Sequence, residues 1–170
     1  IFLDRDGVIN KETGYLHKIE DFKFINGVFE ACQHYEQLGY KIVIVTNQSG
    51  ISRGYYSEDD FRNITDWMIT QFNKNNIQIL DTFHCPHSPI SKCDCRKPKP
   101  GMLLEAKKKY NINMLESWMI GDSERDISAA NLAGIKNTIL VRSGHTINEV
   151  HSNATFFLDS IIQTNQIILK

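Results

Sequence analysis

Apolar runs alternate with amphipathic stretches along the whole chain, a pattern that predicts strands and helices in turn. The run 41–45 (Lys-Ile-Val-Ile-Val) is β-branched and bounded by polar residues, as buried parallel strands are. The expected strands are 1–3, 41–45, 79–83, 118–120, 138–141 and 155–158. The expected helices are 27–38, 101–110, 127–133 and one that is capped by Ser57 and Asp60 and has its apolar positions between Phe61 and Phe72.

Strands that alternate with helices imply right-handed crossovers, and therefore an α/β fold. We expect a three-layer, Rossmann-like and mostly parallel sheet with helices on both faces. The 170 residues suit a single domain over residues 1–170, because no internal repeat or low-complexity linker divides them. A chain of this length has no room for a large cap domain beside the sheet.

Composition and charge exclude several classes of partner. Lys and Arg number 19 and Asp and Glu number 20, so the net charge of −1 gives no basic excess for nucleic acid. No apolar stretch approaches the roughly 20 residues of a membrane span. Residues 1–3 run straight into Asp4 with no visible signal peptide. We expect a cytoplasmic monomer that binds neither nucleic acid nor membrane.

Polar motifs follow four of the expected strands. The residues at these four strand ends are, in chain order, Asp4, Thr46, Cys85 and Asp122. The carboxyl ends of parallel strands lie at one edge of a sheet, where ligands bind in such folds. The sequence therefore predicts one site that these motifs build together.

Two of the motifs are rich in carboxylates. In the Asp4-x-Asp6 motif, one aspartate can attack an electrophile and the other can move protons. The segment 121–126 (Gly-Asp-Ser-Glu-Arg-Asp) supplies Asp122, which can join Asp4 as an oxygen ligand of Mg²⁺, an ion that usually takes one or two carboxylates. Asp126 is expected to cap or brace the helix that follows rather than to bind metal. Taken alone, the Asp4 motif also fits a surface turn.

Two further motifs offer donors to a phosphate. The segment 46–51 (Thr-Asn-Gln-Ser-Gly-Ile) supplies hydroxyl, amide and backbone N–H groups directly after an apolar strand. The loop 96–101 (Arg-Lys-Pro-Lys-Pro-Gly) supplies Lys97 as a point charge and Arg96 as a planar fork. The alternatives are a strand-to-helix turn with hydroxyl capping for the first segment and a solvated basic loop for the second.

Three of the four cysteines lie close together. Cys85 and His87 are followed by Cys93 and Cys95, so four possible ligands fall within eleven residues. Three thiolates and one imidazole suit tetrahedral Zn²⁺. The alternative is a group of buried or redox-active cysteines, but the clustering favours a small zinc-stapled loop. Cys32 lies on the apolar face of a helix and is expected in the core.

The order of these motifs resembles that of the haloacid-dehalogenase-like phosphotransferases. Within this group, the local sequence motifs are similar to those of one branch, the D-glycero-D-manno-heptose 1,7-bisphosphate phosphatases. The likeness extends from residue 2 to about residue 159 and is carried by the segments 4–10, 14–15, 46–51, 53–54 and 85–98.

Histidinol-phosphate phosphatases are the near relatives and share the aspartates, the Thr-Asn-Gln segment and a similar zinc loop. Two features of this chain depart from the heptose branch. The gap between His87 and Cys93 is shorter than in many of its members, and Ser123 stands where a lysine is common. Both departures concern the outer end of the substrate rather than the reaction.

The resemblance implies a two-step phosphomonoesterase. Asp4 would attack phosphorus to form an aspartyl-phosphate, and Asp6 would act first as acid and then as base. Thr46 and Lys97 would hold the phosphoryl oxygens. Mg²⁺ would be bound by Asp4, the Asp6 backbone carbonyl and Asp122, and Zn²⁺ would be structural.

The implied substrate is a small sugar bisphosphate that loses its 7-phosphate, giving heptose 1-phosphate for nucleotide-activated heptose and surface polysaccharide. Arg53 and Arg96 are candidates for a distal phosphate. The expected substrate contacts are Glu12, Thr13, Gly14, Tyr15, Asn47, Gln48, Ser49, Arg53, Arg96 and Ser123. Two alternatives remain: a phosphatase for histidinol phosphate or another small phosphomonoester, and a zinc-stapled binding module with a decayed active site.

Overall fold

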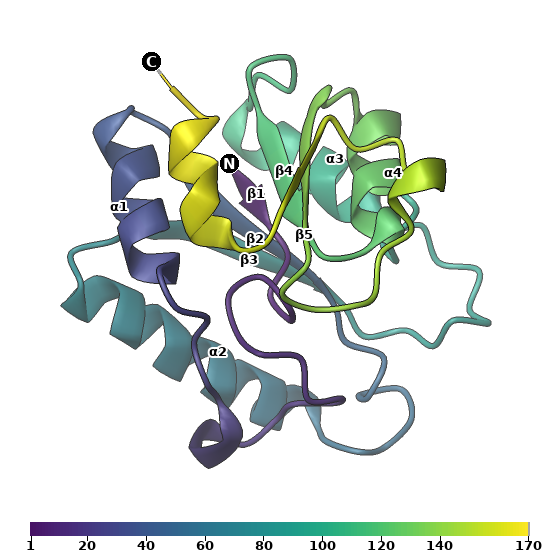
Figure 1. Ribbon diagram of the computed structural model, residues 1–170. Helices are drawn as coiled ribbons and strands as arrows, with labels where there is room; N and C mark the ends of the chain where they lie inside the picture. Colours follow the sequence, from purple (N-terminus) through teal and green to yellow (C-terminus); the bar gives the residue numbers. More distant parts are fainter. Residues whose placement is uncertain (170) are drawn as a thin grey trace.

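The computed structural model describes residues 1–169 and contains a six-stranded sheet flanked by four α-helices (Figure 1). The strands are β1 (Phe2–Leu3), β2 (Ile42–Asn47), β3 (Ile79–Cys85), β4 (Trp118–Gly121), β5 (Asn137–Val141) and β6 (Phe156–Leu158). The α-helices are α1 (Val28–Gln37), α2 (Glu58–Lys74), α3 (Gly101–Tyr110) and α4 (Glu124–Ala133). Short 3-10 helices are η1 (Ile19–Asp21), η2 (Glu149–His151) and η3 (Ile161–Gln166).

All neighbouring strands are parallel, in the order β3-β2-β1-β4-β5-β6. The order reverses at β1, which lies between β2 and β4. Ligands in open parallel sheets bind beyond the carboxyl ends of the strands at such a switch point. The chain leaves β1 and β4 there through Asp4 and Asp122, so the topology itself brings these two carboxylates together.

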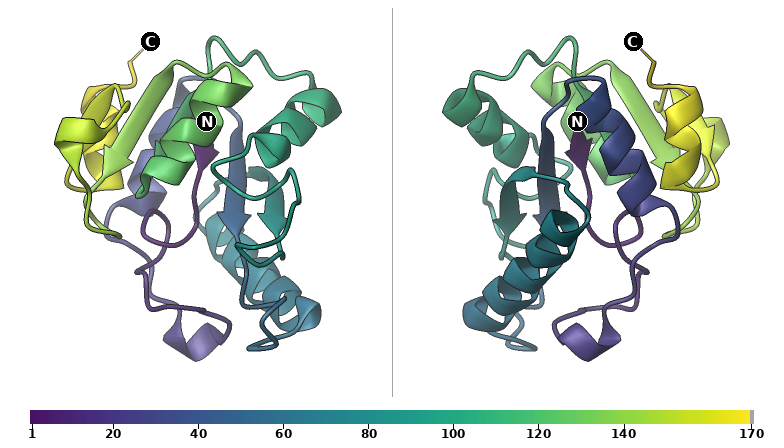
Figure 2. Two further views of the ribbon diagram at one scale, coloured as in Figure 1. Left: turned by 90° about the vertical axis from the view of Figure 1, so that its right-hand side faces the viewer. Right: turned by 90° about the vertical axis from the view of Figure 1, so that its left-hand side faces the viewer.

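Each face of the sheet has its own apolar core, because successive strand residues point to opposite faces. Leu3 and Ile44 belong to the core beneath α1, α2 and η3, whereas Phe2 and Val43 belong to the core beneath α3 and α4. Figure 2 shows the helices on the two sides of the sheet. The α/β fold with helices on both faces is confirmed, and so is the burial of Cys32 in the first core.

The predicted elements are confirmed with small differences at their ends. The clearest difference is α4, which begins at Glu124 rather than at residue 127. Ser123 caps this helix and its side chain accepts from the Arg125 backbone N–H, while Asp126 accepts from the Ser123 N–H. This capping box adds a polar first turn that apolar spacing does not reveal. Within residues 1–169, none of the helices is both long and apolar enough to cross a membrane.

Candidate active site

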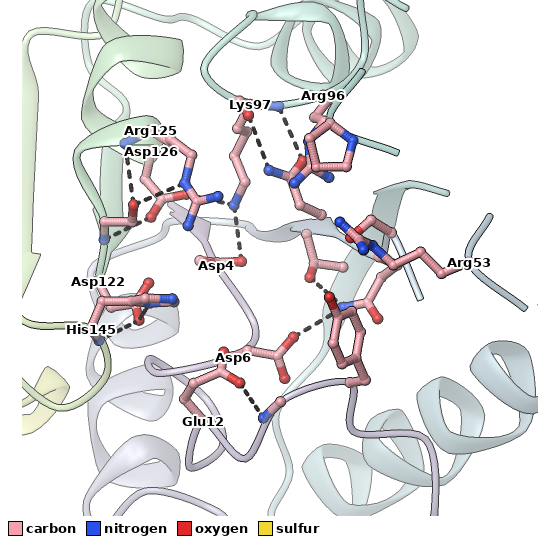
Figure 3. A pocket seen from close by; sticks show the side chains of 18 of the residues that line it. Asp4, Asp6, Glu12, Arg53, Arg96, Lys97, Asp122, Arg125, Asp126 and His145 are labelled. Carbon is pink, nitrogen blue, oxygen red and sulfur yellow. Dashed lines mark hydrogen bonds and ion pairs between the residues drawn. The ribbon is translucent and has the colours of Figure 1, made fainter. Parts of the chain in front are cut away.

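The carboxyl ends of β1, β2 and β4 open into a cavity of about 360 Å³. The residues predicted for catalysis, magnesium and substrate all line this cavity except Thr13, which lines a neighbouring cavity beside His17. Figure 3 shows Asp4, Lys97 and Asp122 around the same space. The motifs that lie far apart in the sequence therefore meet where the strand ends predicted.

A buried lysine lies among carboxylates at the base of the cavity. Lys97 Nζ is 2.9 Å from Asp4 Oδ1 and 2.6 Å from Asp126 Oδ1, and it donates to the Val45 carbonyl at 2.7 Å. Burial alone lowers the pKa of Lys97, but the carboxylates of Asp126 and Asp4 outweigh it and raise that pKa. Lys97 is thus a fixed, permanently charged ammonium group.

The carboxylates of the cluster outnumber this one cation. Burial raises the pKa of Asp4 well above its usual range; Lys97 opposes the shift, while Asp126 and Asp122 add to it. Burial, with a contribution from Asp126, also raises the pKa of Asp122, although hydrogen bonds from His145 oppose that shift. Oxygens of Asp4, Asp122 and Asp126 lie within 4.8 Å of one another, so the cluster attracts a further cation.

Asp122 presents an oxygen suited to a metal ion. Its Oδ1 is buried and has no hydrogen-bond partner among residues 1–169. Its Oδ2 accepts from the His145 backbone N–H at 2.9 Å and lies 2.6 Å from His145 Nδ1. A Cβ on Gly7 or Gly144 would collide with the Asp122 carboxyl group, so two glycines let the backbone approach it. Free carboxylate oxygens of this kind fit Mg²⁺.

Asp126 is engaged on both of its oxygens. Oδ1 pairs with Lys97 at 2.6 Å, and Oδ2 accepts from the Ser123 backbone N–H at 3.1 Å in the capping box. A Cβ on Gly121 would collide with Asp126, which explains the glycine at the end of β4. The prediction that Asp126 braces the helix is confirmed, and it also braces Lys97.

Three side chains fix the carboxylate of Asp6. The Arg5 guanidinium lies 3.0 Å from Asp6 Oδ1, and Asn10 Nδ2 donates to the same oxygen at 2.9 Å. Gln48 Nε2 donates to Oδ2 at 3.0 Å. Arg5 is buried and Asp6 is partly open to the cavity, so the carboxylate is held in one orientation at the cavity wall.

The orientation of Gln48 is set by a tyrosine that the sequence motifs did not single out. Tyr56 Oη donates to Gln48 Oε1 at 2.6 Å, which turns Nε2 toward Asp6 and toward Thr46 Oγ1 at 2.8 Å. Burial raises the pKa of Tyr56 to about 12, so its hydroxyl remains a donor at neutral pH. Gly50 permits the close approach of the Tyr56 ring, because a Cβ there would collide with it.

The rim of the cavity is basic. Arg53 and Arg96 line it, Arg96 donating to the His87 carbonyl at 3.3 Å. Asn47, predicted as a substrate contact, exchanges two hydrogen bonds of 3.1 Å with the Lys97 backbone. The side chain of Asn47 therefore anchors the basic loop to the end of β2.

The cysteine cluster lies in the loop that lines the cavity through Pro89 and Arg96. Candidate ligand atoms of Cys85, His87, Cys93 and Cys95 lie within 4.8 Å of one another. The closest pairs are Cys95 Sγ with Cys85 Sγ at 3.1 Å and His87 Nδ1 with Cys95 Sγ at 3.2 Å. Ligands about 2.3 Å from a tetrahedral Zn²⁺ lie roughly 3.8 Å apart, so modest adjustment suffices. The residues fit the zinc staple that the spacing predicted.

The sequence missed several lining residues because their signals are weak. Tyr56, Arg125, Asp126 and His145 all line the cavity. The capping pattern identified Asp126 only as a helix brace, and His145 comes from the distant loop after β5. Arg125 lies in the first turn of α4, which the apolar spacing did not reveal because it placed the start of this helix at residue 127.

Comparison with known sequences gives relatives of full length. The family model described as HAD-hydrolase-like matches residues 94–164. A protein of Photorhabdus laumondii, named D-glycero-alpha-D-manno-heptose-1,7-bisphosphate 7-phosphatase, is 47% identical, with 95% of each chain covered. The D-glycero-beta-D-manno-heptose-1,7-bisphosphate 7-phosphatase of Escherichia coli K12 is 41% identical and covers 100% of this chain and 93% of its own.

Solved structures agree with the fold. The D,D-heptose 1,7-bisphosphate phosphatase of B. bronchiseptica, complexed with magnesium and phosphate, superimposes with a TM-score of 0.87. It is 28% identical and covers 98% of this chain and 96% of its own. A HAD-like phosphatase of Mesorhizobium loti has a TM-score of 0.82 at 26% identity, covering 98% of this chain and 85% of its own.

Proposed function

This chain belongs to the heptose-1,7-bisphosphate 7-phosphatase family of HAD-like hydrolases, and from that premise we propose that it removes the 7-phosphate of D-glycero-D-manno-heptose 1,7-bisphosphate. The products are heptose 1-phosphate, which serves nucleotide-activated heptose and surface polysaccharide, and inorganic phosphate. The observation that carries the proposal is the meeting of Asp4, Asp6 and Lys97 in one cavity with a basic rim.

In the first step, a carboxylate oxygen of Asp4 attacks the phosphorus of the 7-phosphate. The bond between phosphorus and the sugar oxygen breaks, and Asp6 gives its proton to that oxygen as the sugar leaves. Arg5, Asn10 and Gln48 hold Asp6 in place for this transfer. The product of the step is a phosphate ester on Asp4.

In the second step, water attacks the phosphorus of the aspartyl-phosphate. Asp6, now a carboxylate, accepts a proton from that water, and the bond between phosphorus and the Asp4 oxygen breaks. Inorganic phosphate leaves and Asp4 returns to its starting form. One residue therefore serves as acid and then as base, and each step restores the protonation state that the other requires.

Lys97 and Thr46 bind the oxygens of the phosphoryl group. Lys97 is already charged and fixed, so it stabilises developing negative charge without reorganising. Asp4, Asp122 and the Asp6 backbone carbonyl would hold Mg²⁺, which supplies positive charge between the anionic nucleophile and the anionic phosphate. The unpartnered Oδ1 of Asp122 supports this assignment.

The rim residues are proposed to bind the rest of the substrate. Glu12 accepts from the Gly14 backbone N–H at 2.6 Å and shapes the loop that carries Tyr15. The Arg53 guanidinium carbon lies 5.9 Å from the centre of the Tyr15 ring. Neither Arg53 nor Arg96 is ion-paired with a carboxylate within residues 1–169, so both guanidinium groups are available to bind a distal phosphate.

The cysteine cluster is proposed to bind one structural Zn²⁺. Closed sites with four protein ligands are structural, whereas catalytic zinc keeps an open position. Although burial opposes the shift, hydrogen bonds from the Arg96 backbone and the neighbouring thiols lower the pKa of Cys93 to about 7. Burial raises the pKa of Cys85 and of Cys95, so a bound zinc would have to stabilise those two as thiolates. The stapled loop carries Pro89 and leads into Arg96, so it forms one wall of the cavity.

A substrate comparison tests the proposed function. We expect kcat/KM in Mg²⁺ to be highest for one anomer of heptose 1,7-bisphosphate, above that for histidinol phosphate, and phosphate release to stop in a chelator. A higher kcat/KM for histidinol phosphate would show that the chain is a histidinol-phosphate phosphatase instead. Phosphate release no greater than background with every substrate would favour the zinc-stapled binding module.

A further inference from the structure

The arginines of this chain divide into two groups by their partners. Three of the six are ion-paired: Arg5 with Asp6, Arg62 with Asp59, and Arg142 with Glu149 and Asp159. The other three have no carboxylate within ion-pair distance in the described chain, and all three line the cavity. These unpaired arginines are Arg53, Arg96 and Arg125.

Arg125 differs from the other two because it is not among the substrate contacts expected from the sequence. It lies in the first turn of α4, and its Nε donates to Ser123 Oγ at 3.2 Å. Neither of its terminal guanidinium nitrogens has a hydrogen-bond partner within residues 1–169. Figure 3 shows the side chain bending from α4 toward the side of the cavity where Lys97 lies. Ser123 thus braces the stem of the group while the two terminal nitrogens remain available.

Neither of the two neighbouring acidic residues, Glu124 and Asp126, forms an ion pair with Arg125. Glu124 accepts from Ser152 Oγ at 2.6 Å and from the Asn153 backbone, and Asp126 is engaged with Lys97. A cation at this position is also unfavourable for the helix, since the N-terminus of a helix carries partial positive charge. Arg125 therefore contributes no ion pair to the fold and opposes the dipole of α4.

We propose that Arg125 is a specificity-determining residue that binds the second, non-transferring phosphate of the substrate, opposite Arg96 and Arg53. Lys97 is buried beside Asp4 and serves the phosphate that is transferred, whereas Arg125 is exposed at the rim. A terminal guanidinium edge with two free nitrogens matches a phosphate, often through two parallel hydrogen bonds. This inference rests on the proposed bisphosphatase function.

The test compares two substrates that differ only in the distal phosphate: heptose 1,7-bisphosphate and heptose 7-phosphate. We expect R125A to lower kcat/KM for the bisphosphate by about tenfold to a hundredfold, mostly through KM, because the distal contact is the same in ground and transition states. With heptose 7-phosphate, kcat/KM should change less than about twofold. R125K should recover part of the loss.

A charge control and a stability control separate this role from others. R62A removes the same charge from the exposed face of α2 and should leave both substrates unaffected. Because Arg125 opposes the helix dipole, the Tm of R125A should equal or exceed that of the wild type, whereas a structural role would lower it.

Three results would overturn the assignment. Equal losses of kcat/KM on the two substrates would mean that Arg125 binds the transferred phosphate or stabilises the fold. An unchanged kcat/KM for the bisphosphate would mean that Arg125 does not contact the substrate. A wild-type enzyme that does not prefer the bisphosphate to heptose 7-phosphate would instead refute the proposed function, and the inference with it.

Discussion

Substitution of Asp122 by asparagine should make the metal-free protein more stable while removing its response to Mg²⁺. The buried cluster holds three carboxylates and only one lysine. The asparagine side chain would keep an acceptor for His145 but carry no charge. The substitution therefore separates two effects of the Asp122 carboxylate: its repulsion of the other carboxylates, which lowers the stability of the metal-free protein, and its contribution to cation binding.

The magnitude follows from the spacing of the carboxylates. At 4.8 Å, the upper limit for the separation of the candidate ligand oxygens, two like charges repel by about 3.5 kcal/mol at an effective dielectric constant of about 20. Asp122 faces two such neighbours, Asp4 and Asp126, but Lys97 is ion-paired with both of them and His145 hydrogen-bonds to Asp122, so much of this repulsion is offset. The net gain for D122N is about 1–3 kcal/mol, or roughly 2–12 °C in Tm for a chain of this size.

The assay is thermal unfolding in a chelator and again in Mg²⁺. At about 100 times its Kd, Mg²⁺ should stabilise the wild type by about 2.7 kcal/mol, which is roughly 5–11 °C in Tm. D122N should show little of this rise. D66N is the matched control, because Asp66 is exposed in the middle of α2, away from its first turn, and the substitution changes the charge equally. Its Tm should differ little from the wild type in either buffer.

The stability difference should also depend on pH with a definite sign. The pKa of Asp122 is raised in the folded protein, so below its unfolded pKa of about 3.9 the carboxyl group is protonated in both states. As the pH rises past that value the unfolded state ionises first, and the wild type loses stability that D122N keeps. The advantage of D122N should therefore be small in acid and largest near neutral pH.

Two results would refute this reasoning. If metal-free D122N were less stable than the wild type at pH 7, the carboxylate would be a net stabilising group and the cluster would not be short of positive charge. If Mg²⁺ raised the Tm of D122N as much as that of the wild type, Asp122 would not be a metal ligand.

Three further predictions concern catalysis, zinc and the rim. D4N should fold normally but give no turnover, because an amide is a poor nucleophile; repeated turnover by a clean sample would exclude Asp4 as the nucleophile. Purified protein should contain one Zn²⁺ by metal analysis, and C95S should lose it and loosen the loop, with the far-ultraviolet circular dichroism of the sheet retained; protein without zinc before any chelator would contradict the staple. R96A should lower kcat/KM for the bisphosphate by about tenfold to a hundredfold but lower kcat/KM for p-nitrophenyl phosphate far less. Equal losses on both substrates would show that Arg96 does not bind the distal phosphate.

The fold and the base of the site could be predicted from the sequence because both depend on local patterns. Apolar, β-branched runs give the strands, and polar residues at their ends necessarily gather at one edge of a parallel sheet. Asp4, Thr46 and Asp122 were found this way. The single-domain interpretation of residues 1–170, the monomeric state and the cytoplasmic location stay predictions.

The hydrogen-bond partner of each polar side chain could not be predicted from the sequence. Asn47 fits a phosphate-binding segment, yet its amide is engaged by the Lys97 backbone. His145 has no local pattern and reaches Asp122 only because β4 and β5 are neighbours. Thr13 lies in a predicted substrate loop but lines the adjacent cavity, so its role as a substrate contact stays a prediction.

The cations of the cavity are arranged in two levels, and burial explains why. A buried charge is tolerated only when it is paired, so Lys97 can lie beside the nucleophile because Asp4 and Asp126 neutralise it there. An unpaired guanidinium group has to remain in contact with water, which confines Arg96 and Arg125 to the rim. The base is therefore rigid and already oriented for the reacting phosphate, whereas the rim is solvated and gains its partner only from the substrate. Substitutions at the base should act mainly on kcat and those at the rim mainly on KM, because the first group stabilises charge that develops in the reaction and the second binds charge that does not change.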